Sequence, residues 1–336
     1  MSSSLNASMM EKDKVESAKL LHEKLCELIQ VLRMSVQDRE HSLTLRCWKS
    51  MNEELRIGLD VWRAAIGSIS STATKLGLVL ADPSLCREAT DQCEQLATAC
   101  YVISKSGAGA PLNELVSTAT LQVLTAMRGL VECLISNSRT VDAPPKAGIV
   151  WEACDVALKC PRSNRAAFHR KILAWCCELK DSIEEFRRVL LEEDVDDEES
   201  STAQGQEDQF TDDLFFFGKE NYTEIERQNM QKLLAVLHAV GRTLQCTLIE
   251  LDDAGTNGDF DRIVLCFTQA ERIHQVAALI SEELYPPLEM KTLALRMHTL
   301  LSDLDRFDIA EANVLELCRT RINIVLCDLP CVSTSS

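Results

Sequence analysis

The sequence predicts an all-α protein, and three observations support this fold class. Apolar residues recur at alternating spacings of three and four along most of the chain, beginning with Ala18, Leu21, Leu25, Leu28 and Leu32. Glycine and proline, which interrupt helices, number only 12 and 8 among the 336 residues. Hydrophobic residues make up 46% of the chain, a proportion typical of globular proteins. Because this length exceeds what one hydrophobic core usually serves, we expect two domains.

The N-terminal part is predicted to contain six helices. Asp82 and Pro83 form a typical helix start, because the carboxylate caps free amides and proline needs no hydrogen-bond donor in a first turn. Pro111 begins a helix after the break SGAGAP, Pro161 ends a short one, and NSRTVDAPPKAG (137–148) is expected to be a loop. The predicted helices span about 11–39, 42–80, 83–104, 111–136, 149–160 and 164–193. The last has a wide apolar and aromatic stripe, which favours a central place in the first bundle.

Four more helices are predicted towards the C-terminus. The first two span about 220–252 and 259–284, separated by the loop DDAGTNGD. The sequence Tyr-Pro-Pro at 285–287 forces an extended break, since each proline disfavours helical geometry in the residue before it. Another helix carries the apolar residues from Leu293 to Phe307, and the last spans about 309–327. The two groups of helices predict two antiparallel helical bundles.

An acidic stretch separates the two groups. Residues 190–213 hold eleven Asp and Glu and no Lys or Arg, and they show no apolar periodicity. Such a segment is too charged to bury, so we expect a disordered linker. The predicted organisation is an N-terminal bundle over 1–193, an acidic linker with an aromatic end over 194–218, and a C-terminal bundle over 219–336.

The charge is concentrated in this stretch. Without those eleven acidic residues the net charge falls from −17 to −6, so the folded part is only mildly acidic. This argues against general binding of nucleic acid or of anionic membranes. The N-terminal sequence MSSSLNASMMEKDK has no apolar segment of the kind that directs secretion, and no run approaches 18 uncharged apolar residues. We therefore expect an intracellular protein whose 15 cysteines are free and mostly buried thiols.

No catalytic, cofactor-binding or metal-binding residues are predicted. The loop that begins at Asp253 resembles a calcium loop at several positions, but Val264 stands where the bidentate Glu is required. Cys86, Cys93 and Cys100 recur every seven residues, a spacing that is wrong for zinc and more typical of a close helix contact. The six histidines are scattered, and no HExxH or GxSxG motif occurs. A catalytic group assembled only by folding stays open as an alternative.

Two clusters are candidates for partner binding. The acidic stretch ends in an apolar cluster that is expected either to anchor the second bundle or to dock on a partner. This apolar cluster consists of Leu214, Phe215, Phe216 and Phe217. The second cluster is basic and lies at the start of a helix, where cations oppose the helix dipole. It consists of Arg162, Arg165, Arg170 and Lys171, and it is expected to be solvated, to contact the acidic linker, or to bind an anionic partner.

Several segments occur in an order that is typical of a known family. They are STATLQVLTAMRGLVECL (117–134), VWEACDVALKCPRSNRAA (150–167), the acidic linker with its aromatic end, and ELYPPL (283–288). From about residue 15 to 328 the chain resembles the cyclin-D-binding protein family, also called GCIP. The sharpest marks are YPP and VWxAC, and none of the segments is a catalytic motif. The resemblance implies paired helical bundles akin to those of vinculin and α-catenin.

The resemblance also implies a non-enzymatic regulator of cytoplasm and nucleus. Family members are described as helix-loop-helix proteins without a basic region, which bind D-type cyclins and a signalling adaptor and restrain proliferation or transcription. The sequence agrees with a missing basic region, because Lys12, Lys14 and Lys19 are interspersed with acidic residues. We therefore expect protein partners, no cofactor, and no direct contact with nucleic acid or membrane. The alternatives are a cytoskeletal adaptor that opens its bundles and, less favoured, an enzyme with a dispersed site.

Overall fold

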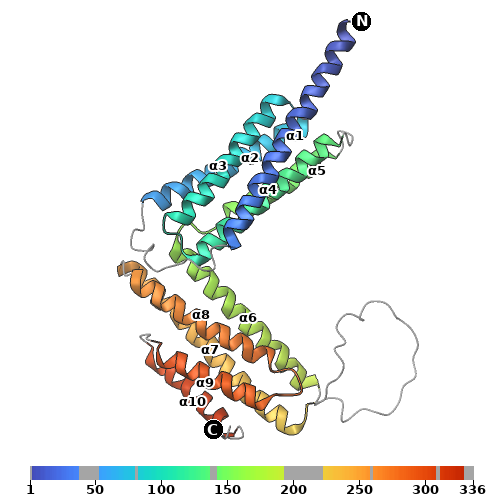
Figure 1. The fold of residues 1–336 in the computed structure, drawn as a ribbon. Coiled ribbons are helices and arrows are strands. Elements are labelled where there is room, and N and C mark those ends of the chain that lie inside the picture. Colours follow the sequence, from blue (N-terminus) through green and yellow to red (C-terminus); the bar gives the residue numbers. More distant parts are fainter. Residues whose placement is uncertain are drawn as a thin grey trace, which may run out of the picture. The chain divides into compact units, whose positions relative to one another are not determined.

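The computed structural model confirms the all-α prediction (Figure 1). Ten helices and no strand occur in the part of the chain that it describes. That part comprises residues 2–37, 53–79, 82–136, 142–192, 222–257, 260–307 and 311–328. The chain divides into two compact units, Met1–Phe168 and His169–Ser336.

The first unit is a bundle of five helices. They are α1 (Ser2–Gln37), α2 (Glu53–Val79), α3 (Pro83–Lys105), α4 (Ala110–Ile135) and α5 (Ala143–Leu158). Helix α1 packs on α3 and α4, whereas α2 packs on α3 and α5, and α4 and α5 also pack on each other (Figure 1). Each helix therefore contributes its apolar stripe to one shared core.

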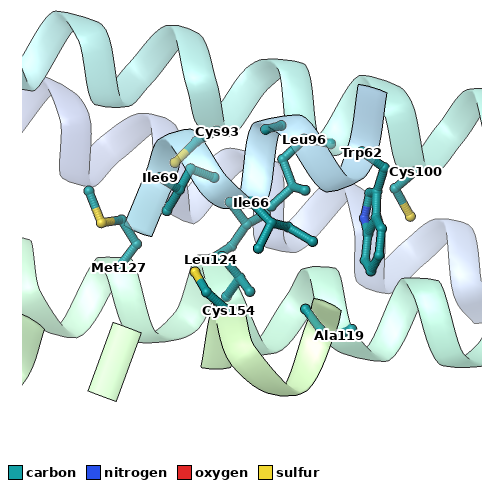
Figure 2. Packing of buried hydrophobic residues seen from close by; sticks show 14 of the residues in the cluster. Trp62, Ile66, Ile69, Cys93, Leu96, Cys100, Ala119, Leu124, Met127 and Cys154 are labelled. Atoms are coloured by element: carbon teal, nitrogen blue, oxygen red, sulfur yellow. The ribbon is translucent and has the colours of Figure 1, made fainter. Parts of the chain in front are cut away.

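A buried polar contact joins two helices in the core of the first unit. Figure 2 shows how side chains from α2, α3, α4 and α5 meet in this core. Trp62 of α2 is fully buried, and its indole Nε1 donates a hydrogen bond to Thr120 Oγ1 at 2.8 Å. The three heptad-spaced cysteines, Cys86, Cys93 and Cys100, are buried on α3, which confirms that these thiols are buried. A buried thiol acts here as a small apolar side chain.

Local signals set most of the helix ends. The Asp82 carboxylate accepts hydrogen bonds from the amides of Ser84 and Leu85, at 2.9 and 3.3 Å, as predicted for the start of α3. The side chain of Ser84 and these amides lower the pKa of Asp82. Helix α5 begins at Ala143, six residues before the predicted start, so residues 143–148 are helix and not loop. Its two prolines lie in the first turn, where no amide donor is needed.

The turn between α3 and α4 is tied to the start of α6 (Asn164–Glu192). Gly107 has a φ of 89°, a left-handed conformation that favours glycine. Asn164 is buried and accepts a hydrogen bond from the Gly109 amide at 2.7 Å, while its Nδ2 donates to the Gly107 carbonyl at 2.9 Å. One side chain thus satisfies two backbone groups that would otherwise lose their water.

The second unit contains most of α6 together with four more helices. They are α7 (Glu224–Asn257), α8 (Phe260–Glu282), α9 (Met290–Asp305) and α10 (Ala312–Asp328). Helix α7 packs on α8 and α10, and α9 packs on the same two helices. On α6, Trp175 stacks on Phe267 and His274 of α8, with ring centroids 5.3 and 4.9 Å apart.

These contacts assign most of α6 to the second unit, which differs from the sequence prediction. The sequence placed the whole helix in the first bundle and the boundary at 193, whereas the structure divides the chain after Phe168, inside α6. The reason is that the aromatic stripe of α6 finds aromatic partners on α8. An apolar stripe predicts burial, but it does not identify the helix that buries it.

Helix α7 is longer than predicted. It runs to Asn257, so residues 252–257 are helical, although the sequence predicted a loop there. The cost of a glycine in a helix is only about 1 kcal/mol. Arg262 of α8 lies 2.6 Å from the buried Glu250 carboxylate of α7, an ion pair that joins the two helices. A helical backbone over 253–257 also differs from a calcium-binding loop.

Helix α4 is the most apolar of the long helices. By length and composition, it is the one helix in the described ranges that passes the test for a membrane span. No membrane-spanning helix was expected from the sequence, because no run in it approaches 18 uncharged apolar residues. Thirteen of its residues are buried in the first unit, as is typical of a core helix.

Candidate interaction surface

The predicted partner-binding residues are only partly described. Leu214, Phe215, Phe216 and Phe217 lie outside the described residues. The hydroxyl of Ser163 accepts a hydrogen bond from the Ala166 amide at 3.2 Å and so caps α6, which confirms that the basic cluster lies at a helix start. Within that cluster, Arg162 and Arg170 are exposed, whereas Arg165 and Lys171 are half-buried and have partners of their own.

The described cysteines are free thiols, and eight of the thirteen are buried. Burial raises the pKa of Cys86 to about 11 and the pKa of Cys93 and of Cys154 to about 12. A thiol with such a pKa stays protonated at neutral pH and is unreactive. Among the described His, Cys, Asp and Glu side chains, no group of three has the geometry of a metal site.

The VWxAC motif has two structural residues and one exposed residue. Val150 and Cys154 are buried in the core, whereas Trp151 is 42% exposed. Its indole Nε1 donates a hydrogen bond to Thr74 Oγ1 of α2 at 3.0 Å. An exposed tryptophan is thus held in one orientation by a neighbouring helix.

The backbones of α2 and α5 approach each other closely one turn away from this tryptophan. A Cβ built on Gly77 would lie 3.0 Å from the Ala147 Cβ, so the two backbones nearly touch there. At the other end, Arg63 Nη2 donates to the Leu158 carbonyl at 2.7 Å, which shows that the helices run antiparallel. Leu78, one turn beyond Thr74 on α2, is 74% exposed. We call Trp151, Thr74 and Leu78 the Trp151 surface.

Sequence reasoning did not identify the Trp151 surface. The buried residues of α5 are Ala143, Ala147, Val150, Cys154 and Ala157, at spacings of three and four. Trp151 lies beside that stripe and not within it, and this offset was the available signal. A core assignment based on residue type alone would have placed it inside.

The second family mark, ELYPPL, is also partly exposed. Tyr285 is 55% exposed, its hydroxyl donates to Glu185 Oε1 at 2.9 Å, and its ring lies 5.0 Å from that of Phe186. Burial raises the pKa of Tyr285, and the Glu185 carboxylate adds to this effect. These contacts hold the segment after α8 against α6 within the second unit. The motif therefore has a structural role in addition to its exposed edge.

The described chain is thus a helical protein with two partly exposed, hydrogen-bonded aromatic side chains, Trp151 and Tyr285. A sequence profile described as "Grap2 and cyclin-D-interacting, N-terminal" matches residues 63–192. Over this range the chain is similar to the Grap2- and cyclin-D-interacting proteins, which confirms the resemblance to GCIP expected from the sequence. All three residues of the Trp151 surface lie in the matched range.

Two named relatives extend the match. The chain is 25% identical over 272 residues to a Cyclin-D1-binding protein 1 homolog of Xenopus laevis, which covers 74% of this chain and 78% of the relative. It is 30% identical over 146 residues to a Cyclin-D1-binding protein 1 homolog of Danio rerio, which covers 40% of this chain and 42% of that relative. The family supports a role in protein–protein interaction.

Proposed function

We propose that this protein is a non-enzymatic regulator that binds a D-type cyclin and thereby restrains cell-cycle progression or transcription. A signalling adaptor and helix-loop-helix proteins are further partners of the same kind. The proposal places the protein in cytoplasm and nucleus. The observation that carries it is the exposed, hydrogen-bonded Trp151, which lies inside the range matched by the cyclin-D-interacting family.

The geometry of Trp151 is suited to a binding hot spot. Tryptophan is enriched among the residues that dominate binding energy, because it combines a large apolar area with a polar N–H. The hydrogen bond to Thr74 restricts the indole before binding, so less side-chain entropy is lost when a partner covers it. Leu78, one turn from Thr74 on α2, adds exposed apolar area.

The charge distribution favours a protein partner. The chain outside 190–213 has a net charge of only −6, so it lacks the large positive field that draws a protein to phosphate groups. The acidic stretch can steer a basic partner towards the bundles. We therefore propose no direct contact with nucleic acid or membrane.

The direct test is binding of a purified D-type cyclin to the full chain, measured by calorimetry. Trp151→Ala is expected to weaken the affinity at least about tenfold, as truncation of a hot spot does. Trp151→Phe should retain part of the affinity, because it keeps an aromatic ring. The matched control is Leu295→Ala on α9, since Leu295 is 63% exposed and lies outside the matched range.

The possible outcomes test the proposed partner and the proposed binding surface separately. If the unaltered chain binds no D-type cyclin, the proposed partner is wrong. If it binds and Trp151→Ala binds equally well, with an unchanged melting temperature, the Trp151 surface is wrong. A parallel loss in Leu295→Ala would point to a general effect on folding and would also contradict the assigned surface.

The two clusters predicted from the sequence are tested in the same assay. Replacing Phe215, Phe216 and Phe217 with Ser should abolish capture at an unchanged melting temperature if the segment docks on the partner. If the segment instead anchors the second bundle, the melting temperature should fall and capture should fall only with it. Reversing the charge of the exposed Arg162 and Arg170 with Glu should slow association if an anionic partner binds there.

A further inference from the structure

One exposed face of α7 in the second unit carries cationic side chains beside a cation of α10. Arg321 of α10 is half-buried, and its Nη1 donates a hydrogen bond to the Ala235 carbonyl of α7 at 2.8 Å. His238 and Arg242 follow Ala235 at spacings of three and four, so they lie on the same face of α7. Both side chains are exposed. The contact between α10 and α7 therefore places a third basic side chain next to these two.

The electrostatic environment of His238 shows that these charges act together. Partial loss of hydration lowers the pKa of His238. Nearby positive charges lower this pKa further, and they belong to Arg187, Arg321 and Arg242. Because Arg187 belongs to α6, three helices contribute a guanidinium group to one surface. A concentration of positive charge on an exposed surface attracts an anionic segment.

Exposed apolar side chains border these cations on α10. Leu317, Arg321 and Ile324 are spaced by four and three, so they share one face of the helix. Leu317 is 40% exposed and Ile324 is 52% exposed. A segment that fits this surface therefore has to be anionic in one part and apolar in another. We call the surface the His238 face, and it consists of Arg187, His238, Arg242, Arg321, Leu317 and Ile324.

The chain itself contains a segment with this chemistry. Residues 190–213 hold eleven Asp and Glu and no Lys or Arg, and the apolar cluster of residues 214–217 follows directly. Both ends of the segment are attached to the second unit. Helix α6 ends at Glu192, and the chain is fixed again at Tyr222, which is buried and whose hydroxyl donates to the Leu284 carbonyl at 3.1 Å.

The length of chain between these two points is sufficient to reach the His238 face. Ile324 lies one turn before Asp328, which pairs with Lys232 of α7 at 2.7 Å. Lys232 is about 12 Å along α7 from the start of that helix. An extended chain between Phe217 and Tyr222 spans up to about 17 Å. The apolar cluster can therefore reach Ile324, and the carboxylates before it can reach the cations beyond.

The basic cluster predicted from the sequence is less well placed for this segment. Along α6, Arg170 lies about 26 Å from Arg187, and Arg187 is the residue nearer to Glu192, where the helix ends. In addition, Arg165 and Lys171 have partners of their own. The acidic stretch thus begins beside the His238 face and far from the basic cluster.

We propose that the His238 face is the docking surface for residues 206–217 of the same chain. The apolar cluster packs on Leu317 and Ile324, and the carboxylates that precede it lie against the guanidinium groups of the face. A partner that binds this face through an acidic segment has to displace the docked segment first. The inference does not depend on the identity of the protein partner proposed above.

The test places an amine in the face of the full chain by Arg242→Lys, which keeps the positive charge. A carbodiimide then joins amines to the carboxylates that they contact, and mass spectrometry measures the linked peptides. The matched control is Arg170→Lys, because Arg170 is also exposed and lies in the basic cluster at the other end of α6. The yield of links to residues 206–213 is expected to be at least about tenfold higher from position 242 than from position 170.

Further changes in the Arg242→Lys chain test the two parts of the contact. Arg187→Glu should lower the yield at least about threefold, because it reverses one charge of the face, whereas Arg162→Glu should leave it unchanged. Replacing Phe215, Phe216 and Phe217 with Ser should lower the yield severalfold, because the apolar contact is lost.

Equal yields from positions 242 and 170 would overturn the proposal. It is also overturned if the yield from position 242 stays the same in both the Arg187→Glu chain and the chain with the three serines, since the links would then report random encounters. Links found only between two copies of the chain, at the mass of a dimer, would assign the face to a second copy and would equally contradict the proposal.

Discussion

The hydrogen bond between Trp62 and Thr120 is expected to determine much of the stability of the first unit. Both residues are fully buried, and Thr120 Oγ1 accepts the indole N–H at 2.8 Å while donating to the Val116 carbonyl. Thr120→Val keeps the shape of the side chain and removes the acceptor. The Trp62 N–H is then left without a partner in the core, far from water.

The expected cost follows from that unpaired group. A buried donor that loses its acceptor destabilises a protein by about 1–3 kcal/mol. The lost hydrogen bond from the Thr120 hydroxyl to the Val116 carbonyl adds little to the destabilisation, because this carbonyl can still accept a backbone hydrogen bond within the helix. A change of this size accelerates amide exchange in α4 by about fivefold to 150-fold, since each 1.4 kcal/mol is a factor of about ten.

Hydrogen exchange followed by mass spectrometry of α2 and α4 peptides measures this change, and it reports on the first unit separately from the second. The decisive comparison adds Trp62→Phe, which removes the donor. In that background Thr120→Val should cost less than about 0.5 kcal/mol, because no indole N–H is left unpaired. If Thr120→Val costs the same in both backgrounds, the reasoning from the hydrogen bond is refuted.

Three other predictions concern proteolysis of the chain, the stability of the first unit and the pH dependence of the second. Limited proteolysis should cut between residues 194 and 213. The two fragments should co-elute in gel filtration, because Trp175 on α6, in the N-terminal fragment, stacks on Phe267 in the C-terminal fragment. Fragments that separate would contradict this. Asn164→Ala should destabilise the first unit by about 2 kcal/mol in the same exchange assay, since it leaves the Gly107 carbonyl and the Gly109 amide unpaired. Asn164→Asp should destabilise it less, because the aspartate still accepts the hydrogen bond from the Gly109 amide. Burial lowers the pKa of His274, despite the nearby Glu178, and that of His238. Unfolding lets both rings bind protons they exclude when folded, so the second unit should lose thermal stability as the pH falls below about 6.5, and less so in His274→Gln.

Local signals in the sequence determined where most helices lie. The three-and-four spacing placed Leu21, Leu25 and Leu32 on the buried face of α1, and the Asp82 cap defined the start of α3. These features depend on neighbours within one or two turns, so they can be recognised without knowing the fold. The predicted loops at the start of α5 and at the end of α7 were wrong. The effect of the α5 prolines and of Gly255 depends on the position that each takes within its helix.

The candidate sites were determined only in part by the sequence. It placed Arg162, Arg165, Arg170 and Lys171 near a helix start, and α6 does begin at Asn164, but it left open which of them are exposed. It did not distinguish Trp151 from a core tryptophan such as Trp62, since both belong to apolar helices and only one faces solvent. Residue type gives the tendency to be buried, and the neighbouring helix decides whether burial occurs.

By itself, the sequence determined that the chain folds into helices, which residues form their apolar stripes, and that its charge is concentrated in one segment. Only the tertiary structure decided that α6 turns its aromatic stripe towards Phe267 and His274, and that His22 of α1 meets Glu132 of α4. Helical periodicity is a property of neighbouring residues, whereas the pairing of two stripes depends on the shape and chemistry of both. His22 and Glu132 are 110 residues apart in the chain, and no local pattern records a contact over that separation.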